Sequence, residues 1–482
     1  MRTRFSASLL LASLARAAPI NDGLPNAEEA TKFAFTYGFP LVPYAKVAVD
    51  ILGELKAPNI FYHSKELATP EDKSVVRPNA DTLYSSAPID LSCQDLVVHI
   101  PAIEDRYWVF PFYDVYGNNY ANLGSNSGST SGKYLVRYAP SVGQEPGVQL
   151  CDAGSYKCDG FNGIVNAPTT YGLLLPRLAV KNRDTDIENI NTLQEQMDLR
   201  PLRRKCHGDA PPLTVDLLNS TLSGDEAMQV LELTARVAPY NPPPNIKDQL
   251  HVDCMLKTAG IHDGVYEPRV KNLTAVAGAA QGSIKASYQM PANSMQLQNG
   301  WETITPDVQG NFGGNYEMRS YVAVWGYLQL QASEALYPTY APEGKEGKKL
   351  NLGPDEAYVF TFLSKPPVAT RGFWSLTAYG PDKYLIDNPM DRYLLGDRDA
   401  LTYADGTLVY GVKNHDDESF QILIQPSDKA PPQNWTSNWL PAPAGGGDFE
   451  LTLRFYAPGE ELQDGTWVYP AVQKLGAITE SI

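Results

Sequence analysis

Short runs of β-branched and aromatic residues, broken by Gly, Asn, Pro and Ser, occupy two long stretches of this chain. They extend from about residue 75 to residue 178 and from residue 350 to the end, and examples are residues 107–113 (YWVFPFY) and 449–456 (FELTLRFY). Strands of this length, with side chains that alternate every two residues, are typical of antiparallel sheets with one buried face. The first stretch therefore predicts an antiparallel β-sandwich or barrel and the second a further β-sandwich, and the strand-helix alternation of doubly wound folds is missing.

The stretch between them, and the segment before the first, have the apolar spacing of helices. We expect helices at residues 27–37, after Asn26 as a possible N-cap, and at residues 188–197, 223–237, 246–256, 273–288 and 316–335. A chain of 482 residues exceeds what a single core usually supports. The predicted organisation is a signal peptide at 1–17, a helical segment at 18–66, a first sandwich domain at 67–183, a helical bridge at 184–349 and a second sandwich domain at 350–482.

The N-terminal residues have the three parts of a secretory signal. Arg2 and Arg4 precede an apolar run at residues 5–15, and small residues at 15–17 suggest cleavage before Ala18. The alternative is a membrane anchor, but spanning a bilayer takes about 20 apolar residues and this run is shorter. We therefore expect a secreted, extracellular and soluble protein. Its formal net charge of −16 disfavours nucleic acid and anionic membranes as partners, since both require clustered Lys and Arg.

In a secreted protein the five cysteines can form disulfides and the three sequons can be glycosylated. Cys151 and Cys158 lie at the end of an expected hairpin and form the first predicted disulfide, and Cys206 with Cys254 forms the second. Cys93 then remains a buried thiol. The predicted N-glycosylation sites are Asn219, Asn272 and Asn434.

Known catalytic motifs are absent from the chain. It has no Gly-x-Ser-x-Gly elbow, no phosphate-binding glycine loop and no zinc-type spacing of Cys and His, and its six histidines are scattered. A His-based triad or a two-His metal centre is therefore not expected, and we expect no cofactor. Any chemistry should use carboxylates, arginines, hydroxyls and amides.

Polar residues that could do this chemistry concentrate in residues 77–90 (RPNADTLYSSAPID) and on the strands that follow. We predict Asp81 and Asp114 as an acid-base pair, since two carboxylates in unequal environments can divide these roles, with Arg106 holding an anionic group. The structural alternative is that these are paired charges of a core, for example Asp81 with Arg106.

Side chains suited to ligand contacts lie close to these residues. The predicted ligand-binding residues are Asn79, Tyr84, Asn118, Asn119 and Trp439. Asn118 and Asn119 open a run rich in amides and hydroxyls at residues 116–132, which suits a polyhydroxylated or aromatic ligand but is equally the composition of a surface loop. Trp439 stands next to Leu-Pro-Ala-Pro, which suggests a rigid lid or wedge.

Two sets of polar-aromatic blocks also resemble a known family. Residues 77–84 (RPNADTLY), 105–107 and 114–119 resemble domain of unknown function 1254, and residues 373–377 (FWSLT), 387–389 and 438–443 (NWLPAP) resemble domain of unknown function 1214. The resemblance implies two jelly-roll-like antiparallel β-sandwiches in tandem, a mainly β fold with helical insertions. It implies no established activity or cofactor.

Two functions remain open at this stage. The first is a secreted enzyme that acts on a small or oligomeric hydroxylated or aromatic compound by carboxylate acid-base chemistry. The second is a non-catalytic extracellular protein that binds a small molecule or carbohydrate, with residues 116–132 and Trp439 as a stacking platform.

Overall fold

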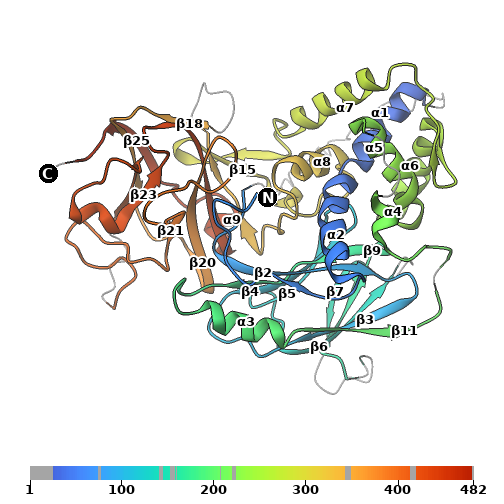
Figure 1. Cartoon of the computed structure of the whole chain (residues 1–482), viewed down its shortest axis with the longest axis horizontal. Coiled ribbons are helices and arrows are strands. Elements are labelled where there is room, and N and C mark those ends of the chain that lie inside the picture. Colours follow the sequence, from blue (N-terminus) through green and yellow to red (C-terminus); the bar gives the residue numbers. More distant parts are fainter. Residues whose placement is uncertain are drawn as a thin grey trace, which may run out of the picture.

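The N-terminal domain is a β-sandwich in the computed structural model (Figure 1), which describes residues 25–73, 77–139, 145–151, 158, 160–206, 208–219, 224–341, 349–412 and 419–479. One sheet has the strand order β1-β2-β10-β4-β5, with β9 paired to both β2 and β4, and the other has the order β11-β3-β6-β8-β7. The inner faces meet in one apolar core that includes Leu83, Val98, Phe110 and Val136. The strands are β1 (Tyr62–His63), β2 (Thr82–Asp90), β3 (Gln94–Ile100), β4 (Trp108–Asp114), β5 (Asn119–Gly124), β6 (Gly132–Tyr138), β7 (Gly147–Leu150), β8 (Gly163–Ala167), β9 (Tyr171–Leu174), β10 (Arg177–Ala179) and β11 (Asp198–Arg203).

The C-terminal domain is a second sandwich. Its larger sheet has the order β14-β15-β17-β24-β20-β21, with β16 and β18 also paired to β24, and its smaller sheet has the order β23-β22-β19-β25. Trp301, Phe360, Trp374 and Phe455 belong to the core between them. The strands are β14 (Ser294–Gln296), β15 (Trp301–Ile304), β16 (Ala335–Leu336), β17 (Thr339–Tyr340), β18 (Lys349–Leu352), β19 (Glu356–Phe362), β20 (Val368–Tyr379), β21 (Leu394–Gly396), β22 (Phe420–Pro426), β23 (Trp439–Ala442), β24 (Gly447–Pro458) and β25 (Ala471–Gly476).

The expectation of a mainly β fold with helical insertions is confirmed. Most neighbouring strands are antiparallel, and the sheets are mixed because β6 pairs with β8, and β22 with β23, in parallel. A hairpin between β12 (Ile261–His262) and β13 (Val265–Tyr266) lies apart from the two sandwiches.

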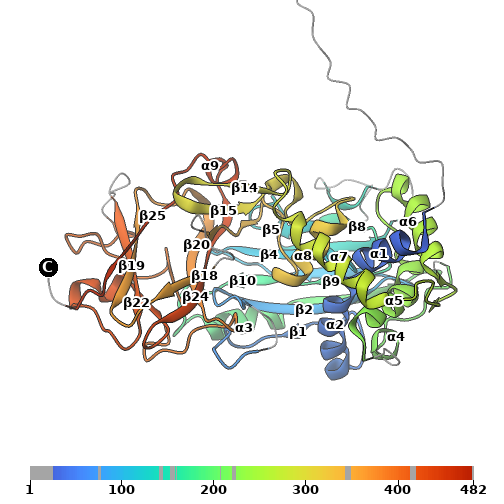
Figure 2. The same cartoon turned by 90° about the horizontal axis from the view of Figure 1, so that it is seen from above.

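Helices cover one face and one end of the N-terminal sandwich (Figures 1 and 2). Helix α2 packs its Tyr44 and Leu52 against Tyr113 and Leu173 of the first sheet. Helix α1 starts where the sequence predicts, because the Asn26 side chain accepts a hydrogen bond from the Glu29 amide. The helices are α1 (Ala27–Gly38), α2 (Leu41–Leu55), α3 (Ile187–Glu195), α4 (Val215–Asn219), α5 (Glu226–Val237), α6 (Ile246–Ala259), α7 (Leu273–Ser287), α8 (Tyr316–Trp325) and α9 (Glu460–Gln463).

The segment at 184–349, which the sequence indicated as a helical bridge, also supplies strands to both sandwiches. Strand β11 pairs with β3, and β14 to β17 join the larger C-terminal sheet. The helix expected at 316–335 ends at Trp325, since Gly326 is extended and Leu328 has a φ of 62°. This early end turns the backbone carbonyl of Leu328 toward the first sheet, where it accepts hydrogen bonds from Tyr113 and Arg177.

The cysteine pairing is partly as predicted. The disulfide between Cys151 and Cys158 is confirmed, with Cα atoms 6.3 Å apart. The predicted pair of Cys206 with Cys254 is wrong, because Cys206 bonds to Cys93 and Cys254 is a free thiol on α6. The cause is β11: its antiparallel register with β3 leads the chain back to Cys93, a pairing hidden while this segment was expected to be helical.

Other sequence-based expectations concern the ends of the chain and its surface. The predicted signal peptide at 1–17 lies outside the described residues. Asn219, Asn272 and Asn434 are all exposed. No helix in the described part of the chain has the length and apolar character needed to cross a membrane.

Candidate functional site

The three residues predicted as catalytic lie in separate networks. Asp81 is 1% exposed, and its carboxylate forms an ion pair with Arg398 and accepts a hydrogen bond of 2.7 Å from the Ser375 hydroxyl. Arg106 is also buried and binds both carboxylate oxygens of Asp186, at 2.7 and 2.9 Å. The alternative pairing of Asp81 with Arg106 is therefore wrong: each has another partner.

Asp114 lies at the turn from β4 to β5. Its carboxylate accepts hydrogen bonds from the amides of Tyr116 and Asn118 and from the Asn118 side chain. Burial raises the pKa of Asp114, and the charge of Arg319 acts against this rise. Among the described residues no hydrogen bond or ion pair joins Asp114 to Asp81 or Arg106, and the acid-base pair stays a prediction.

Three of the predicted ligand-binding residues are parts of the core. Asn118 and Asn119 are buried, and Asn119 bonds to the backbone of Phe112 and Ala121 within the β4–β5 hairpin. Trp439 is 5% exposed and packs on the outer side of β22, with its indole nitrogen bonded to the Gln425 carbonyl. The stacking platform of residues 116–132 with Trp439 is thus absent, because β5 takes up much of that run and Trp439 is enclosed.

The remaining two, Asn79 and Tyr84, do come together, at the interface between the domains. The Asn79 side-chain amide donates to the hydroxyl of Tyr456 on β24, and its oxygen caps the amides of Asp81 and Thr82. Tyr84 on β2 lies next to Arg177 on β10, whose guanidinium carbon is 5.3 Å from the centroid of the Tyr84 ring.

Arg177 is the centre of this cluster. Its side chain is 4% exposed, and Nη2 donates hydrogen bonds of 2.9 Å to the Tyr113 hydroxyl and 2.7 Å to the Leu328 carbonyl. The described residues include no carboxylate in an ion pair with Arg177, and its Nε has no hydrogen-bond partner there. Removing a guanidinium from water without a counter-charge costs several kcal/mol, so this cation lacks the compensation that buried charges usually have.

Four phenols surround the Arg177 cation, those of Tyr84, Tyr113, Tyr337 and Tyr456. We call Arg177, these tyrosines and Asn79 the Arg177 cluster. Burial raises the pKa of Tyr113 and of Tyr337, while the positive charge of Arg177 lowers both. The Tyr337 hydroxyl is buried and has no partner of normal hydrogen-bond geometry among the described residues. The cluster thus offers hydrogen-bond donors and one uncompensated positive charge.

A carboxyl group lies beside the cluster. The hydroxyl of Tyr107 donates a 3.0 Å hydrogen bond to Glu334, and the Tyr107 ring packs against Tyr456 with centroids 5.3 Å apart. Glu334 is 3% exposed, and burial raises its pKa to about 7. This carboxyl group can therefore exchange its proton near neutral pH.

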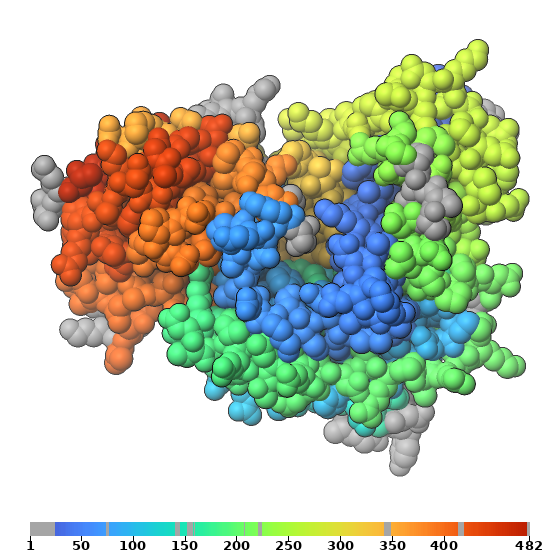
Figure 3. Space-filling model, viewed as in Figure 1, coloured from blue at the N-terminus to red at the C-terminus, as the bar shows by residue number. Residues whose placement is uncertain are grey.

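The interface is open on one side. Figure 3 shows a hollow at the centre of the face seen in Figure 1, between α2 and the C-terminal domain and above β2. Tyr84 and Tyr337 are partly buried, whereas Arg177, Tyr113, Tyr456 and the Tyr337 hydroxyl are enclosed.

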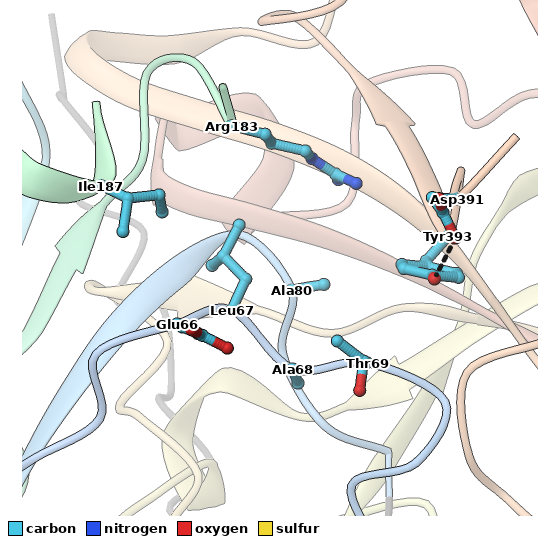
Figure 4. A pocket seen from close by; sticks show the side chains of 9 residues that line it. All are labelled: Glu66, Leu67, Ala68, Thr69, Ala80, Arg183, Ile187, Asp391 and Tyr393. Carbon is cyan, nitrogen blue, oxygen red and sulfur yellow. Dashed lines mark hydrogen bonds between the residues drawn. The ribbon is translucent and has the colours of Figure 1, made fainter. Parts of the chain in front are cut away.

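A second cavity, of about 210 Å³, lies at another point of the interface (Figure 4). Leu67, Ala68, Ala80 and Ile187 give it a largely apolar wall, with Arg183 reaching across it. Glu66 and Asp391 also line it and oppose the charge of Arg183, so it offers no net attraction for an anion.

No group of three His, Cys, Asp or Glu side chains within the described ranges is placed to hold a metal ion. Sequence analysis missed Arg177, although a signal was present. Arg177 is a charged residue inside the apolar run 172–180 (GLLLPRLAV), where a charge needs a partner or a function.

The fold and this interface define a protein of two tandem β-sandwich domains with a polar site between them. The chain matches the models described as "Protein of unknown function (DUF1254)" at residues 58–201 and "Protein of unknown function (DUF1214)" at residues 334–460, and it belongs to the family that joins these domains in this order.

The first of two solved structures similar to this chain agrees with the fold. The crystal structure of the VPA0106 protein from Vibrio parahaemolyticus is similar with a TM-score of 0.60 and 19% identity, over 93% of this chain and 100% of that one. An uncharacterised protein from Burkholderia cenocepacia matches with a TM-score of 0.42 and 12% identity, over 94% of this chain and 95% of that one. No curated protein matches the sequence.

Proposed function

We propose that this protein is a secreted enzyme that acts on a small hydroxylated or aromatic compound with a negative charge, bound between the two domains at the Arg177 cluster. The observation that carries this proposal is a buried guanidinium with no carboxylate in an ion pair among the described residues, beside the buried hydroxyl of Tyr337. Such a site gains most from a ligand that brings the missing negative charge.

The chemistry follows from the side chains present. Arg177 would hold an oxyanion of the substrate, and the flat ring of Tyr84 would contact its carbon skeleton. The Tyr337 hydroxyl is the group available to donate a proton or hydrogen bond to an oxygen on which negative charge develops. Acid-base chemistry would thus use phenols, in place of the carboxylates Asp81 and Asp114.

The second candidate is a non-catalytic binding protein with the same site. It is favoured by the fact that the Arg177 cluster contains no carboxylate or imidazole that could act directly as a base. Product formation separates the two candidates, because both predict the same binding.

Binding is tested by calorimetry with benzoate, 4-hydroxybenzoate and neutral benzamide. We expect the two anions to bind and benzamide not to bind, and we expect Arg177→Gln to weaken anion binding at least tenfold. Arg200→Gln is the matched control, because Arg200 is exposed and its ion pair among the described residues is with the nearby Asp198. Equal binding of benzamide and benzoate, or unchanged binding by Arg177→Gln, would contradict the site.

Catalysis is tested by mass spectrometry after incubation with a panel of phenolic acids, hydroxy acids and lactones. The enzyme proposal expects a product with the wild type and at least a hundredfold slower formation with Tyr337→Phe. Binding of panel members without any product would favour the second candidate.

Secretion is part of the proposal and has its own test. Two disulfides and three exposed sequon asparagines are compatible with the secretory route. Expression of the full chain in a secreting eukaryotic host should yield protein in the medium that begins at Ala18 and loses mass on treatment with an N-glycosidase. Retention in the cell with Met1 intact would overturn it.

A further inference from the structure

A second buried guanidinium, that of Arg454 on β24, lies at the interface between the domains. It is 5% exposed, and it donates hydrogen bonds to uncharged oxygens: the Thr377 hydroxyl at 2.8 Å, the Tyr379 hydroxyl and, at 3.3 Å, the Arg77 carbonyl. A guanidinium has more N–H groups than these bonds use, so Arg454 keeps donors for a further acceptor. No carboxylate within the described ranges forms an ion pair with it, as for Arg177.

The neighbouring guanidinium groups, in contrast, are paired. Arg77 forms an ion pair with Glu450, which lies on β24 one turn of the strand pleat away from Thr452 and Arg454, and Arg398 forms one with Asp81. The Asp81 carboxylate also attracts Arg454, but its ion pair is with Arg398. The charge of Arg454 therefore lacks the full compensation that buried charges usually have.

The strand register places Arg454 beside the Arg177 cluster. On β24 the Phe455 ring points into the core of the C-terminal sandwich, so Arg454 and Tyr456 lie on the opposite face, toward the N-terminal domain. Strand β16 pairs Leu336 with Phe455, and Leu336 belongs to the same core. The next residue, Tyr337, therefore comes opposite Arg454 and on the same face as Arg454.

Two phenols of the cluster lie between Arg177 and Arg454. Burial raises the pKa of Tyr337, and the positive charges of Arg177 and Arg454 both act against this rise. Tyr456 also interacts electrostatically with both cations. Packing agrees, because Tyr456 belongs to an apolar cluster with Val109, the β4 residue that pairs with Arg177, and Tyr337 packs against the same cluster.

We propose that Arg454 is a second ligand-binding residue of this site, and that the ligand is a dianion with one negative group held by Arg177 and the other by Arg454. This inference rests on the proposed function and narrows its ligand to a hydroxylated or aromatic dicarboxylate. The two cations belong to different domains, so the ligand bridges the two sandwiches. It reaches them past Tyr84 and Tyr337, the partly buried side chains of the cluster. Each carboxylate gains charge-assisted hydrogen bonds, which are stronger than neutral ones.

The experiment compares ligands that differ by one charge. Isophthalate and terephthalate, which hold two carboxylates at different separations, are titrated into the protein by calorimetry at pH 8, together with their monomethyl esters and benzoate. All carboxyl groups are ionised at this pH. Each ester keeps nearly the shape of its diacid but has a single negative charge. We expect the wild type to bind at least one dianion tenfold or more tightly than its ester.

Variants of Arg454 test which residue recognises the second charge. In Arg454→Gln the dianion should bind no more tightly than its ester. Arg454→Lys keeps a positive charge and should retain a preference for the dianion, which separates loss of the charge from damage to the fold. Arg371→Gln is the matched control, because Arg371 is an exposed residue of β20 in the same sheet, and it should keep the preference of the wild type.

The outcomes distinguish this inference from the proposed function. Equal affinity of the wild type for each dianion and its ester, or a preference that persists in Arg454→Gln, would overturn the role of Arg454 alone. Failure of the wild type to bind any of these anions, benzoate included, would overturn the proposed site and the second cation together.

Discussion

The carboxylate of Asp81, just before β2 in the N-terminal domain, forms an ion pair with the guanidinium of Arg398 in the C-terminal domain. Arg398 also donates hydrogen bonds to the carbonyls of Asp81 and Val180, at 3.1 and 2.8 Å. A second ion pair joins Arg77 to Glu450 on β24. The polar segment at 77–82 therefore docks one sandwich on the other, and this docking places Asn79 against Tyr456.

Loss of the Asp81 carboxylate should destabilise the domain interface. Asp81→Asn leaves Arg398 with a positive charge that is mostly buried, and breaking one partner of a buried pair costs about 3 to 5 kcal/mol. We expect the free energy of unfolding, measured by urea denaturation, to fall by about 3 kcal/mol.

Two further variants separate the loss of this buried ion pair from the general effect of removing a carboxylate. Replacing both partners, as Asp81→Asn with Arg398→Met, should recover part of the loss because the Arg398 charge is removed together with that of Asp81. Asp382→Asn removes the exposed ion pair with Lys73 and should cost less than about 1 kcal/mol. A loss in Asp81→Asn no larger than in Asp382→Asn would contradict the docking role.

The disulfide between Cys93 and Cys206 should contribute strongly to the stability of the folded protein, because it closes a long loop. It links residues 113 apart in the sequence, and closing a loop of that length restricts the unfolded chain by about 4 to 5 kcal/mol in the chain-entropy view. We expect the double variant Cys93→Ser with Cys206→Ser to lower the melting temperature by several degrees.

Cys254→Ser is the control for this pair and should leave the melting temperature unchanged. Peptide mapping without reduction should recover the Cys93 peptide joined to the Cys206 peptide. A cross-link between Cys206 and Cys254 would show that β11 does not pair with β3.

Local patterns predict the two sandwiches and most helices correctly. The sequences of β20 and β24 alternate apolar and polar residues, and both strands are buried over most of their length. Helix α1 has its cap at Asn26, so local sequence predicts these elements. The failures concern long-range pairing. Nothing near Cys206 in the sequence indicates that residues 198–203 add a strand to β3, because edge strands rich in Arg lack the usual alternation.

The site was predictable only in part for the same reason. Asn79 and Tyr84 were found because they lie in a dense polar motif, whereas Arg177, Tyr337 and Tyr456 reach the cluster from three distant segments. The pairing of Asp81 with Arg106 was also wrong. Asp81 pairs with Arg398 and Arg106 with Asp186, and both partners are distant in the sequence. The local sequence shows that a buried charge needs a partner, but it does not identify the partner residue.

The hydroxyl of Tyr337 should matter for binding and not for stability. Among the described residues the buried Tyr337 hydroxyl has no hydrogen bond of normal geometry, and its interaction with Arg177 offsets only part of a desolvation cost of about 1 to 3 kcal/mol. Tyr337→Phe should therefore be as stable as the wild type or more stable in urea denaturation, and it should bind benzoate less tightly.

Tyr113→Phe is the matched comparison. The Tyr113 hydroxyl donates to the Leu328 carbonyl at 2.8 Å and accepts from Arg177, so its removal should lower stability by about 1 to 2 kcal/mol. If Tyr337→Phe is destabilised as much as Tyr113→Phe, the Tyr337 hydroxyl has a structural partner and is not waiting for a ligand.

The stability of the empty protein should depend on pH through Glu334. Burial raises the pKa of its carboxyl group to about 7 in the folded state, whereas an unfolded glutamate has a pKa near 4.3. Between these values the folded state holds the proton that the unfolded state has lost. The contribution of Glu334 is therefore most favourable below pH 4, falls as the pH rises to about 7, and is constant above it.

Glu334→Gln removes this dependence because glutamine does not titrate. The free energy of unfolding of the variant, relative to the wild type, should rise between pH 5 and pH 7.5 by an amount on the order of 3 kcal/mol and then level off. Asp397 titrates in the same range, so the difference between wild type and variant is the quantity to measure, and the same difference for Asp397→Asn should add to it independently. The difference in free energy of unfolding between wild type and Glu334→Gln could instead stay constant over this range. That result would mean that Glu334 is already ionised in the folded protein and that an unrecognised cation or water compensates its charge beside Tyr107.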